Sequence, residues 1–289
     1  MSLSIRRARA DDRDAIAAFT LDTFPWGDYV ADEFAGWLDE PGTAMYVATD
    51  DGEVPVALGR ARMLSPTEAW FHAARVRPDH RGRGIAGHLA FTLMDWARDT
   101  GALVARLLIE DWNEAAARHV AKIGFRPVAA FTFGVRAIGD ASPVPSGNGG
   151  KRAPARLRAR PAGSAEAEPA YSSWSVGPLG RASRGLFGVQ WAFRRLSTSD
   201  LIDAAKQDSL WEIGAGWAVA TRGDSGFDVP WIETRPEDAG DLVRALIDLG
   251  SSIGVESIRV WLPTTDWLVR EARREGFEIH PMTVHVCEL

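Results

Sequence analysis

Val76-Arg77-Pro78-Asp79-His80-Arg81-Gly82-Arg83-Gly84-Ile85-Ala86 decides the fold, because it reads as the end of a strand, a glycine-rich turn and the start of a helix. Gly82 and Gly84 can take positive φ angles without a Cβ penalty and let the main chain approach a ligand closely. The orphan N–H groups and positive dipole end of the following helix point at the same volume. Arg81 and Arg83 add charged donors. The stretch therefore predicts a site for a phosphate-sized anion.

The residues that follow the turn strengthen this prediction, since a glycine-rich turn alone recurs by chance. Residues 85–99 carry apolar side chains at helical spacing, at Ile85, Leu89, Leu93 and Trp96. Residues 103–110 form an apolar run of strand length. A second helix then begins, capped by either Asp111 or Asn113, and ends at Gly124.

This order of elements resembles the GNAT acetyltransferase superfamily. The phosphate-loop pattern of that family, R/Q-x-x-G-x-G/A, is matched by Arg81, Gly84 and Ala86, and the preceding V-x-P is matched by Val76 and Pro78. The resemblance spans residues 4 to 136. It implies an α/β domain with a mixed sheet, in which two parallel strands splay apart to admit the pantetheine arm of acetyl-CoA.

The resemblance also implies which residues contact the coenzyme. A bulge near the end of the first splayed strand would free main-chain groups at Ala74 and Val76 for the pantetheine amides, and the N–H of Val76 would polarise the thioester carbonyl. The other expected contacts lie in the turn and at the start of the second helix: Arg81, Gly82, Arg83, Gly84, Ile85, Ala86 and Asn113.

Transfer to an amine requires a group that takes the amine proton, because a primary amine is protonated at neutral pH. His72 lies on the strand of Val76 and has an ordinary pKa of about 6.5, which suits this role. Glu68 begins the same strand and Glu110 closes the next one. Each of the three is either the base or a structural residue.

A proton donor for the departing thiolate is harder to identify. Family members often carry a Tyr where this chain has Val120, whose helical spacing from Ala116 and Ile123 is typical of core packing. Three alternatives remain. Water protonates the thiolate, another side chain such as Tyr29 reaches in, or the chain binds the coenzyme without efficient transfer.

The chain contains an internal repeat. Gly276-Phe277 lies 152 residues after Gly124-Phe125 (276 − 124 = 152), and each pair ends a helix that follows an apolar strand. The second copy is six residues shorter across the turn, since 124 − 78 = 46 but 276 − 236 = 40. Carboxylates replace the arginines and paired glycines there and repel phosphate, so only the first copy is expected to bind coenzyme.

We therefore expect two tandem GNAT-like domains. The first covers residues 1–139 and is the acetyl-CoA-binding domain; residues 140–153, rich in Ser, Pro and Gly, form a flexible linker; and residues 154–289 form a degenerate second domain. The 289 residues are enough for two cores.

The composition of the chain limits the kinds of partner that the protein is expected to bind. The net charge of −6 disfavours nucleic acid, which is bound by clustered Lys and Arg, and no apolar run approaches the roughly 18 residues of a membrane span. With a single cysteine, Cys287, and no signal run, we expect a cytoplasmic protein, monomeric or homodimeric, without a membrane partner or a metal.

The acceptor is expected to be an amine of a small molecule or peptide, attacking the thioester directly in a ternary complex. The resemblance places it beside residues 24–29 and 32–37. The aromatic and acidic side chains there either form a wall for a cationic amine, or belong to an ordinary amphipathic helix with Phe34 and Trp37 in the core. The alternative to an N-acetyltransferase is a non-catalytic acyl-CoA-binding module.

Overall fold

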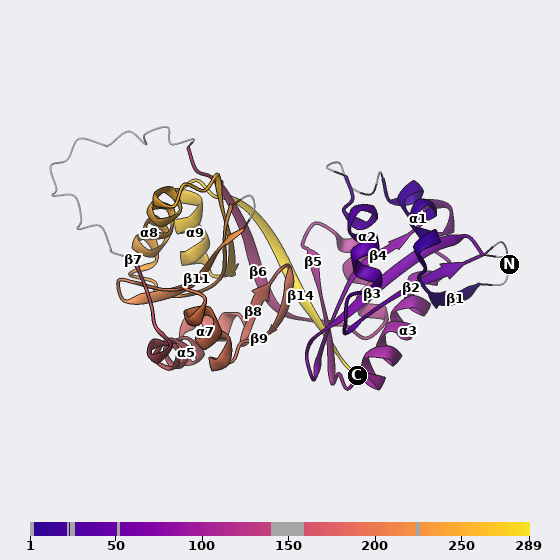
Figure 1. Cartoon of the computed structure of the whole chain (residues 1–289), viewed down its shortest axis with the longest axis horizontal. Helices are drawn as coiled ribbons and strands as arrows, with labels where there is room; N and C mark the ends of the chain where they lie inside the picture. The colour runs from indigo at the N-terminus through magenta and orange to yellow at the C-terminus, as the bar shows by residue number, and fades with distance from the viewer. Residues whose placement is uncertain (1–2, 22, 24–26, 51–52, 140–158, 224–225) are drawn as a thin grey trace. The chain divides into compact units, whose positions relative to one another are not determined.

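The computed structural model describes residues 3–21, 23, 27–50, 53–139, 159–223 and 226–289. They form two compact units, shown in Figure 1. Unit 1 comprises Met1–Pro127 and His285–Leu289, and unit 2 comprises Val128–Val284. The division therefore falls at residue 127 and not at residue 139, and the expected linker 140–153 lies outside the described residues.

Unit 1 is a mixed sheet with helices on both faces. Its elements are β1 (Ser4–Arg7), α1 (Arg13–Thr20), α2 (Val30–Leu38), β2 (Thr43–Thr49), β3 (Pro55–Ser65), β4 (Glu68–Val76), α3 (Ile85–Asp99), β5 (Val104–Glu110) and α4 (Glu114–Lys122). The strand order is β1-β2-β3-β4-β5, followed by the end of β14 (Glu278–Glu288). Neighbours from β1 to β4 are antiparallel, whereas β4 and β5 are parallel.

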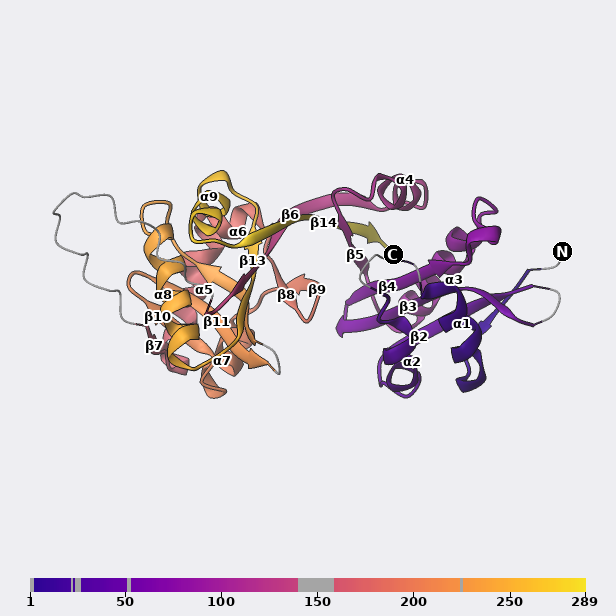
Figure 2. The same ribbon diagram turned by 90° about the horizontal axis from the view of Figure 1, so that it is seen from above.

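Opposite faces of this sheet have separate cores. Helix α3 packs on one face through Leu93, Met94 and Ala97, while Trp96 remains only partly buried. Helices α1 and α2 cover the other face, where Phe34 and Trp37 join the core. In Figure 1 the strands of unit 1 lie between these two layers, and Figure 2 shows the same unit from above. The burial of Phe34 and Trp37 therefore confirms the alternative in which residues 32–37 belong to an ordinary amphipathic helix.

The splay and the bulge expected in this sheet are both present. Strands β4 and β5 pair from Glu68↔Val104 to Trp70↔Arg106, and the ladder stops there although both strands continue. On the other side of β4, Leu58 pairs with Arg75 but Arg60 pairs with His72, so β4 has one extra residue. Ala73 takes φ 56° at this point. The bulge thus lies beside the opening between the parallel strands.

Unit 2 repeats the same order with an inserted hairpin and one additional helix. Its elements are β7 (Ala159–Pro161), α5 (Ala167–Val176), α6 (Pro178–Ala182), β8 (Leu186–Val189), β9 (Ala192–Arg195), α7 (Thr198–Lys206), β10 (Leu210–Ile213), β11 (Gly216–Gly223), β12 (Gly226–Glu233), α8 (Ala239–Ser252), β13 (Ser257–Pro263) and α9 (Asp266–Arg274). Strands β6 (Arg126–Ala137) and β14 complete its sheet. Gly124 and Gly276 end equivalent helices with φ 95° and 84°, as the internal repeat predicts.

The parallel strands of unit 2 also separate, but side chains of the inserted hairpin pack beside the point of separation. Strands β12 and β13 also stop pairing, after Val229↔Val260, and β12 also carries a bulge. The bulge contains Pro230, which has no N–H to offer a ligand. Trp261, the next residue of β13, packs against Phe193 and Trp191 of the inserted hairpin at centroid distances of 5.1 and 4.8 Å.

Each unit includes a strand from the other sequence copy, which explains the shifted boundary. From Val128 onward, β6 belongs to unit 2, where it pairs along the whole of β13. The last residues of the chain belong to unit 1, where the N–H of Leu289 donates to the carbonyl of Leu103 at 2.9 Å and Cys287 packs against the core.

Candidate functional site

The glycine-rich turn has the backbone conformation that its sequence predicts. Gly82 and Gly84 take φ 76° and 77°, and Gly84 caps α3. A Cβ atom at Gly82 would meet no heavy atom within 4 Å, so the space above the turn is open. Arg81 and Arg83 are exposed, whereas Ile85 is buried and anchors the first turn of α3. The residues present therefore fit a phosphate group bound at this helix end.

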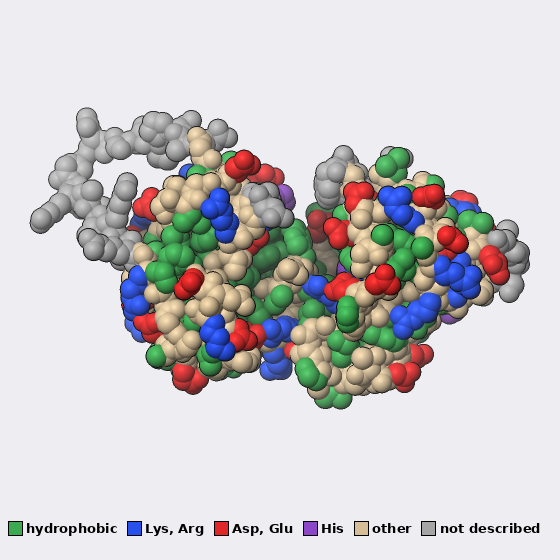
Figure 3. Space-filling view, viewed as in Figure 1, with side chains coloured by type: hydrophobic (Ala, Val, Ile, Leu, Met, Phe, Trp, Pro, Cys, Tyr) green, Lys and Arg blue, Asp and Glu red, His purple; other side chains and the backbone are tan. Residues whose placement is uncertain are grey.

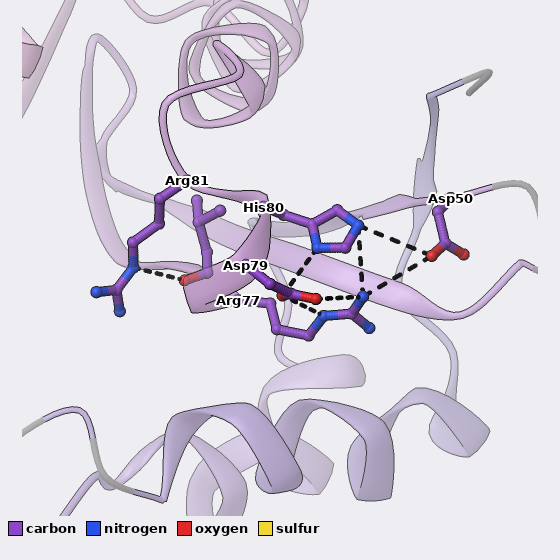
Figure 4. A network of polar contacts seen from close by, with 6 residues as sticks. Asp50, Arg77, Asp79, His80 and Arg81 are labelled. Atoms are coloured by element: carbon purple, nitrogen blue, oxygen red, sulfur yellow. Dashed lines mark hydrogen bonds and ion pairs between the residues drawn. The ribbon is translucent and has the colours of Figure 1, made fainter.

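A polar network fixes the approach to the turn (Figure 4). The guanidinium of Arg77 donates to the carboxylate of Asp79 at 2.8 and 3.2 Å, and Asp79 also lies 2.9 Å from Nδ1 of His80. These contacts, first with Arg77 and then with His80, hold the pKa of Asp79 well below its usual range. Asp50 lies 3.9 Å from both basic side chains. His80 is buried here.

The side chain of Arg81 bends back onto β4 in this structure. Its Nε donates to the carbonyl oxygen of Val76 at 3.1 Å, as Figure 4 also shows. Ala74 is exposed and Val76 is half-buried. The predicted coenzyme contacts on the strand and in the turn therefore lie close together.

His72 is held neutral. Its Nε2 lies 2.8 Å from Nη1 of Arg60, and its ring meets Trp37 at a centroid distance of 5.2 Å. Burial, followed by repulsion from Arg60, Arg62 and Arg75, lowers the pKa of His72 from 6.5 to about 3. Because a guanidinium only donates, Nε2 accepts and its lone pair is engaged. This environment argues against His72 as the base.

Glu68 and Glu110 lie on the same sheet face but differ in surroundings. Oε1 of Glu68 accepts from Nη1 of Arg106 at 2.6 Å, and both side chains are buried where the parallel strands still pair. This ion pair gives Glu68 a structural role. Glu110 lies four residues beyond Arg106, at the open end of the splay, and is half-buried.

Tyr29 precedes α2 and is 48% exposed. Its ring meets Trp37 edge-on at 5.8 Å, and the guanidinium of Arg75 lies 5.8 Å from its centroid. Desolvation raises the pKa of the Tyr29 hydroxyl, so the group keeps its proton at neutral pH. Tyr29 can therefore donate a proton.

Helix α4 settles two alternatives left by the sequence. The side chain of Asn113 accepts the N–H of Ala116 at 3.1 Å, so Asn113 is the N-cap and Asp111 is not. Val120 is buried in the core of unit 1. The packing role of Val120 is thus confirmed, and its side chain supplies no proton donor.

An arginine-rich face of the sheet was not predicted from the sequence. Asp32 and Glu33 of α2 are exposed to solvent, and Phe24–Trp26 lies outside the described residues. Three charged side chains lie instead on the sheet face beneath α2. They are Arg60 and Arg62 of β3 and Arg75 of β4. The available signal was the pair of arginines at alternate positions in the apolar run of residues 55–64, which places both on one face.

A groove of about 560 Å³ lies beside the turn. Ala15, Ala18 and Phe19 of α1 form one wall, and Arg77 and Arg81 line it near the turn. Both apolar surface and guanidinium groups are therefore available next to the anion site.

Three further observations concern membrane spans, metal ions and surface charge among the described residues. Among them, no helix is both long and apolar enough to cross a membrane, and no group of His, Cys, Asp and Glu side chains is arranged to hold a metal ion. On the face shown in Figure 3, basic and acidic side chains are interspersed. That face offers no continuous basic surface to a polyanion.

Comparisons with known proteins agree with this geometry. Residues 12–125 match the model of the Acetyltransferase (GNAT) family. A GCN5-related N-acetyltransferase from Sphaerobacter thermophilus shares 16% identity over 99% of this chain and 95% of its own, with a TM-score of 0.68. A tandem GNAT protein from the clavulanic acid biosynthesis pathway shares 14% identity over 99% and 98% of the two chains, with a TM-score of 0.59. No curated protein matches the chain in sequence. At these identities the structural matches show the fold.

Proposed function

We propose that this chain is an acetyl-CoA-dependent N-acetyltransferase whose coenzyme binds to unit 1, because residues 12–125 match the model of the Acetyltransferase (GNAT) family. The observation that carries the proposal is the open turn over Gly82 and Gly84, next to a bulged strand and a parallel pair that separates. A phosphate group at the turn and an extended arm along β4 would use these features together.

Residues of unit 1 would hold the coenzyme from two sides. The main-chain N–H groups of the turn, helped by Arg81 and Arg83, would bind its phosphates, and main-chain groups near Ala74 and Val76 would bind the arm. Arg81 would have to release the carbonyl oxygen of Val76 before that oxygen could accept a hydrogen bond from the coenzyme. The coenzyme supplies an activated acetyl group as a thioester, and the protein supplies its orientation.

Unit 2 is proposed to bind no coenzyme. The helix that corresponds to α3 begins at Ala239 and follows Glu237 and Asp238, whose charge opposes a phosphate. The bulge contains Pro230, and Trp261 of the parallel pair is packed by the inserted hairpin.

Proton transfer is assigned to two side chains on the α1/α2 side of unit 1. Glu110 is the proposed base, because it lies at the open end of the splay and a carboxylate can accept the amine proton. Tyr29 is the proposed donor to the departing thiolate, because it is half-exposed on this side of the sheet and a tyrosine hydroxyl is protonated at neutral pH. A free thiolate has an ordinary pKa of about 8.5, so the donor assists the reaction without being indispensable.

A non-catalytic acyl-CoA-binding module remains the second candidate. It is favoured by His72, whose Nε2 is engaged by Arg60, and by Val120, which is buried where family members often carry a Tyr. Both candidates predict coenzyme binding, and only the first predicts transfer.

The experiment measures acetyl-CoA binding by calorimetry and thiol release with a panel of amines. Gly84→Glu should abolish binding, because a carboxylate would occupy the anion site. Gly254→Glu is the matched control, since Gly254 has a similar φ of 70° and open space around it but lies in unit 2. Unchanged affinity in Gly84→Glu would refute the site. Binding without thiol release from any amine would select the module.

A further inference from the structure

Three arginines converge beneath α2 on one face of the sheet in unit 1. Arg60 and Arg62 stand two residues apart on β3, opposite His72 and Trp70 of β4. Arg75 follows the bulge and stands opposite Leu58, on the same face. All three are close enough to His72 to lower its pKa by charge repulsion. We refer to Arg60, Arg62 and Arg75 as the arginine cluster.

Two carboxylates face the arginine cluster and leave it with excess positive charge. Glu40 forms an ion pair with Arg60 and also attracts Arg62. Asp28 accepts from Arg75 at 2.6 and 3.4 Å and from the N–H of Val30 at 3.0 Å, so its hydrogen-bonding capacity is largely used. His72 adds no charge because it is neutral. Among the residues that the structure describes, three guanidinium groups therefore face the two carboxylates of Glu40 and Asp28.

The buried member of the cluster has an unused donor. Arg60 is 1% exposed, donates to Glu40 and His72, and has no hydrogen-bond partner for Nε among the described residues. Its guanidinium lies 4.8 Å from the ring centroid of Trp37. Keeping a cation and an unpaired donor in the interior costs stability, and a bound anion would offset part of that cost. The planar fork of an arginine matches a carboxylate.

The arginine cluster has an apolar wall and a route to solvent. Trp37 and Tyr29 stand edge to face at 5.8 Å, and Tyr29 is 48% exposed. The side chain of Glu40 is 39% exposed, and Arg62 is only partly buried. The aromatic rings therefore give the cluster an apolar neighbour, and the partly buried Arg62 connects it to the solvent-exposed edge.

We propose that the arginine cluster binds a carboxylate of the acceptor, so that the substrate is a small amine that also carries a carboxylate. This inference rests on the proposed function of unit 1. Arg62 is the proposed contact, because it is only partly buried, whereas Arg60 is buried and Arg75 is held by Asp28. The cluster lies next to the bulge, where His72 directly precedes Ala73. The alternative of an acidic wall for a cationic amine is not supported, because Asp32 and Glu33 face solvent.

The test compares amines that differ only in a carboxylate. Thiol release is measured for a panel of amino acids, for the carboxamide of each and for the corresponding decarboxylated amine. The amino acids should be used with higher kcat/KM than their partners. Arg62→Ala should raise KM for the amino acid about 10- to 100-fold and leave the carboxamide unchanged, since only the former loses a charge-assisted contact. Arg98→Ala, at a surface arginine on α3 paired with Asp95, is the control and should change neither.

The outcomes separate this inference from the proposed function. If acetyl-CoA is used with carboxamides or decarboxylated amines as efficiently as with amino acids, the carboxylate site is refuted and the acetyltransferase stands. If no amine releases thiol, the acetyltransferase is refuted. The cluster is then tested by calorimetric titration with the same amino acids. Weaker binding in Arg62→Ala supports the carboxylate site, and binding equal to that of the carboxamides overturns it.

Discussion

The neutral state of His72 makes the stability of unit 1 depend on pH in a calculable way. In the folded chain the pKa of His72 is about 3, whereas the ordinary value is 6.5. Below pH 6.5 the unfolded chain therefore binds a proton that the folded chain refuses. The resulting stability is complete above the unfolded pKa and is lost as the pH falls from 6.5 toward 3. Each pH unit in this window costs about 1.36 kcal/mol.

The perturbation that isolates this effect is His72→Gln. The side-chain oxygen of Gln can accept the hydrogen bond that Nε2 accepts from Arg60, but the residue does not titrate. Acidification from about pH 7.5 to about pH 5 should lower the unfolding free energy of the wild type by about 2 kcal/mol relative to the variant. All other titrating groups are common to both proteins and cancel in the difference.

The assay is urea unfolding of both proteins at a series of pH values, with the imidazole of His72 followed by NMR. A difference between wild type and variant that stays constant from about pH 7.5 to about pH 5 would refute the reasoning. So would an NMR titration of His72 near its ordinary pKa of about 6.5. Either result would mean that the arginine cluster does not surround the ring as described.

Three further predictions concern other parts of the chain. Arg106→Met should lower the unfolding free energy, measured by urea unfolding, by about 3–5 kcal/mol. The substitution leaves the buried carboxylate of Glu68 without its cation. Asn113→Ala should cost about 1 kcal/mol in the same assay by removing the cap of α4. Thr265→Ala should cost less, since the hydroxyl of Thr265 caps nothing in the equivalent helix. Burial raises the pKa of Glu233, so stability should fall as the pH rises from 4.5 through the folded pKa, and Glu233→Gln should remove this slope in thermal unfolding.

Local rules explain what the sequence predicted well. The turn and the bounds Ile85–Asp99 of α3 depend on glycine conformations, helix capping and apolar spacing within about 20 residues, and the structure has all three. The choice between Asp111 and Asn113 stayed open because both are good caps. Only the hydrogen bond to Ala116 distinguishes them.

Features that depend on distant residues could not be read in the same way. The hydrophobic patterns of β6 and β14 are those of half-buried strands, and nothing local says which sheet receives them. The arginine cluster joins three side chains of two strands, and its charge balance depends on Glu40 and Asp28 from the segments that flank α2. The sequence alone directed attention to Asp32 and Glu33, which the turn of α2 points outward.

The arginine cluster bears on the chemistry as well as on the choice of substrate. The charges that repel a proton from His72 would act on any amine bound on the same face, and would lower its pKa for the same physical reason. An amine whose carboxylate is held at the cluster would therefore lose its proton more readily than it does in water. Such a site needs a proton acceptor for the departing proton but not a strong base. A carboxylate such as the proposed base Glu110, at the open end of the splay, would then be sufficient without the imidazole of His72.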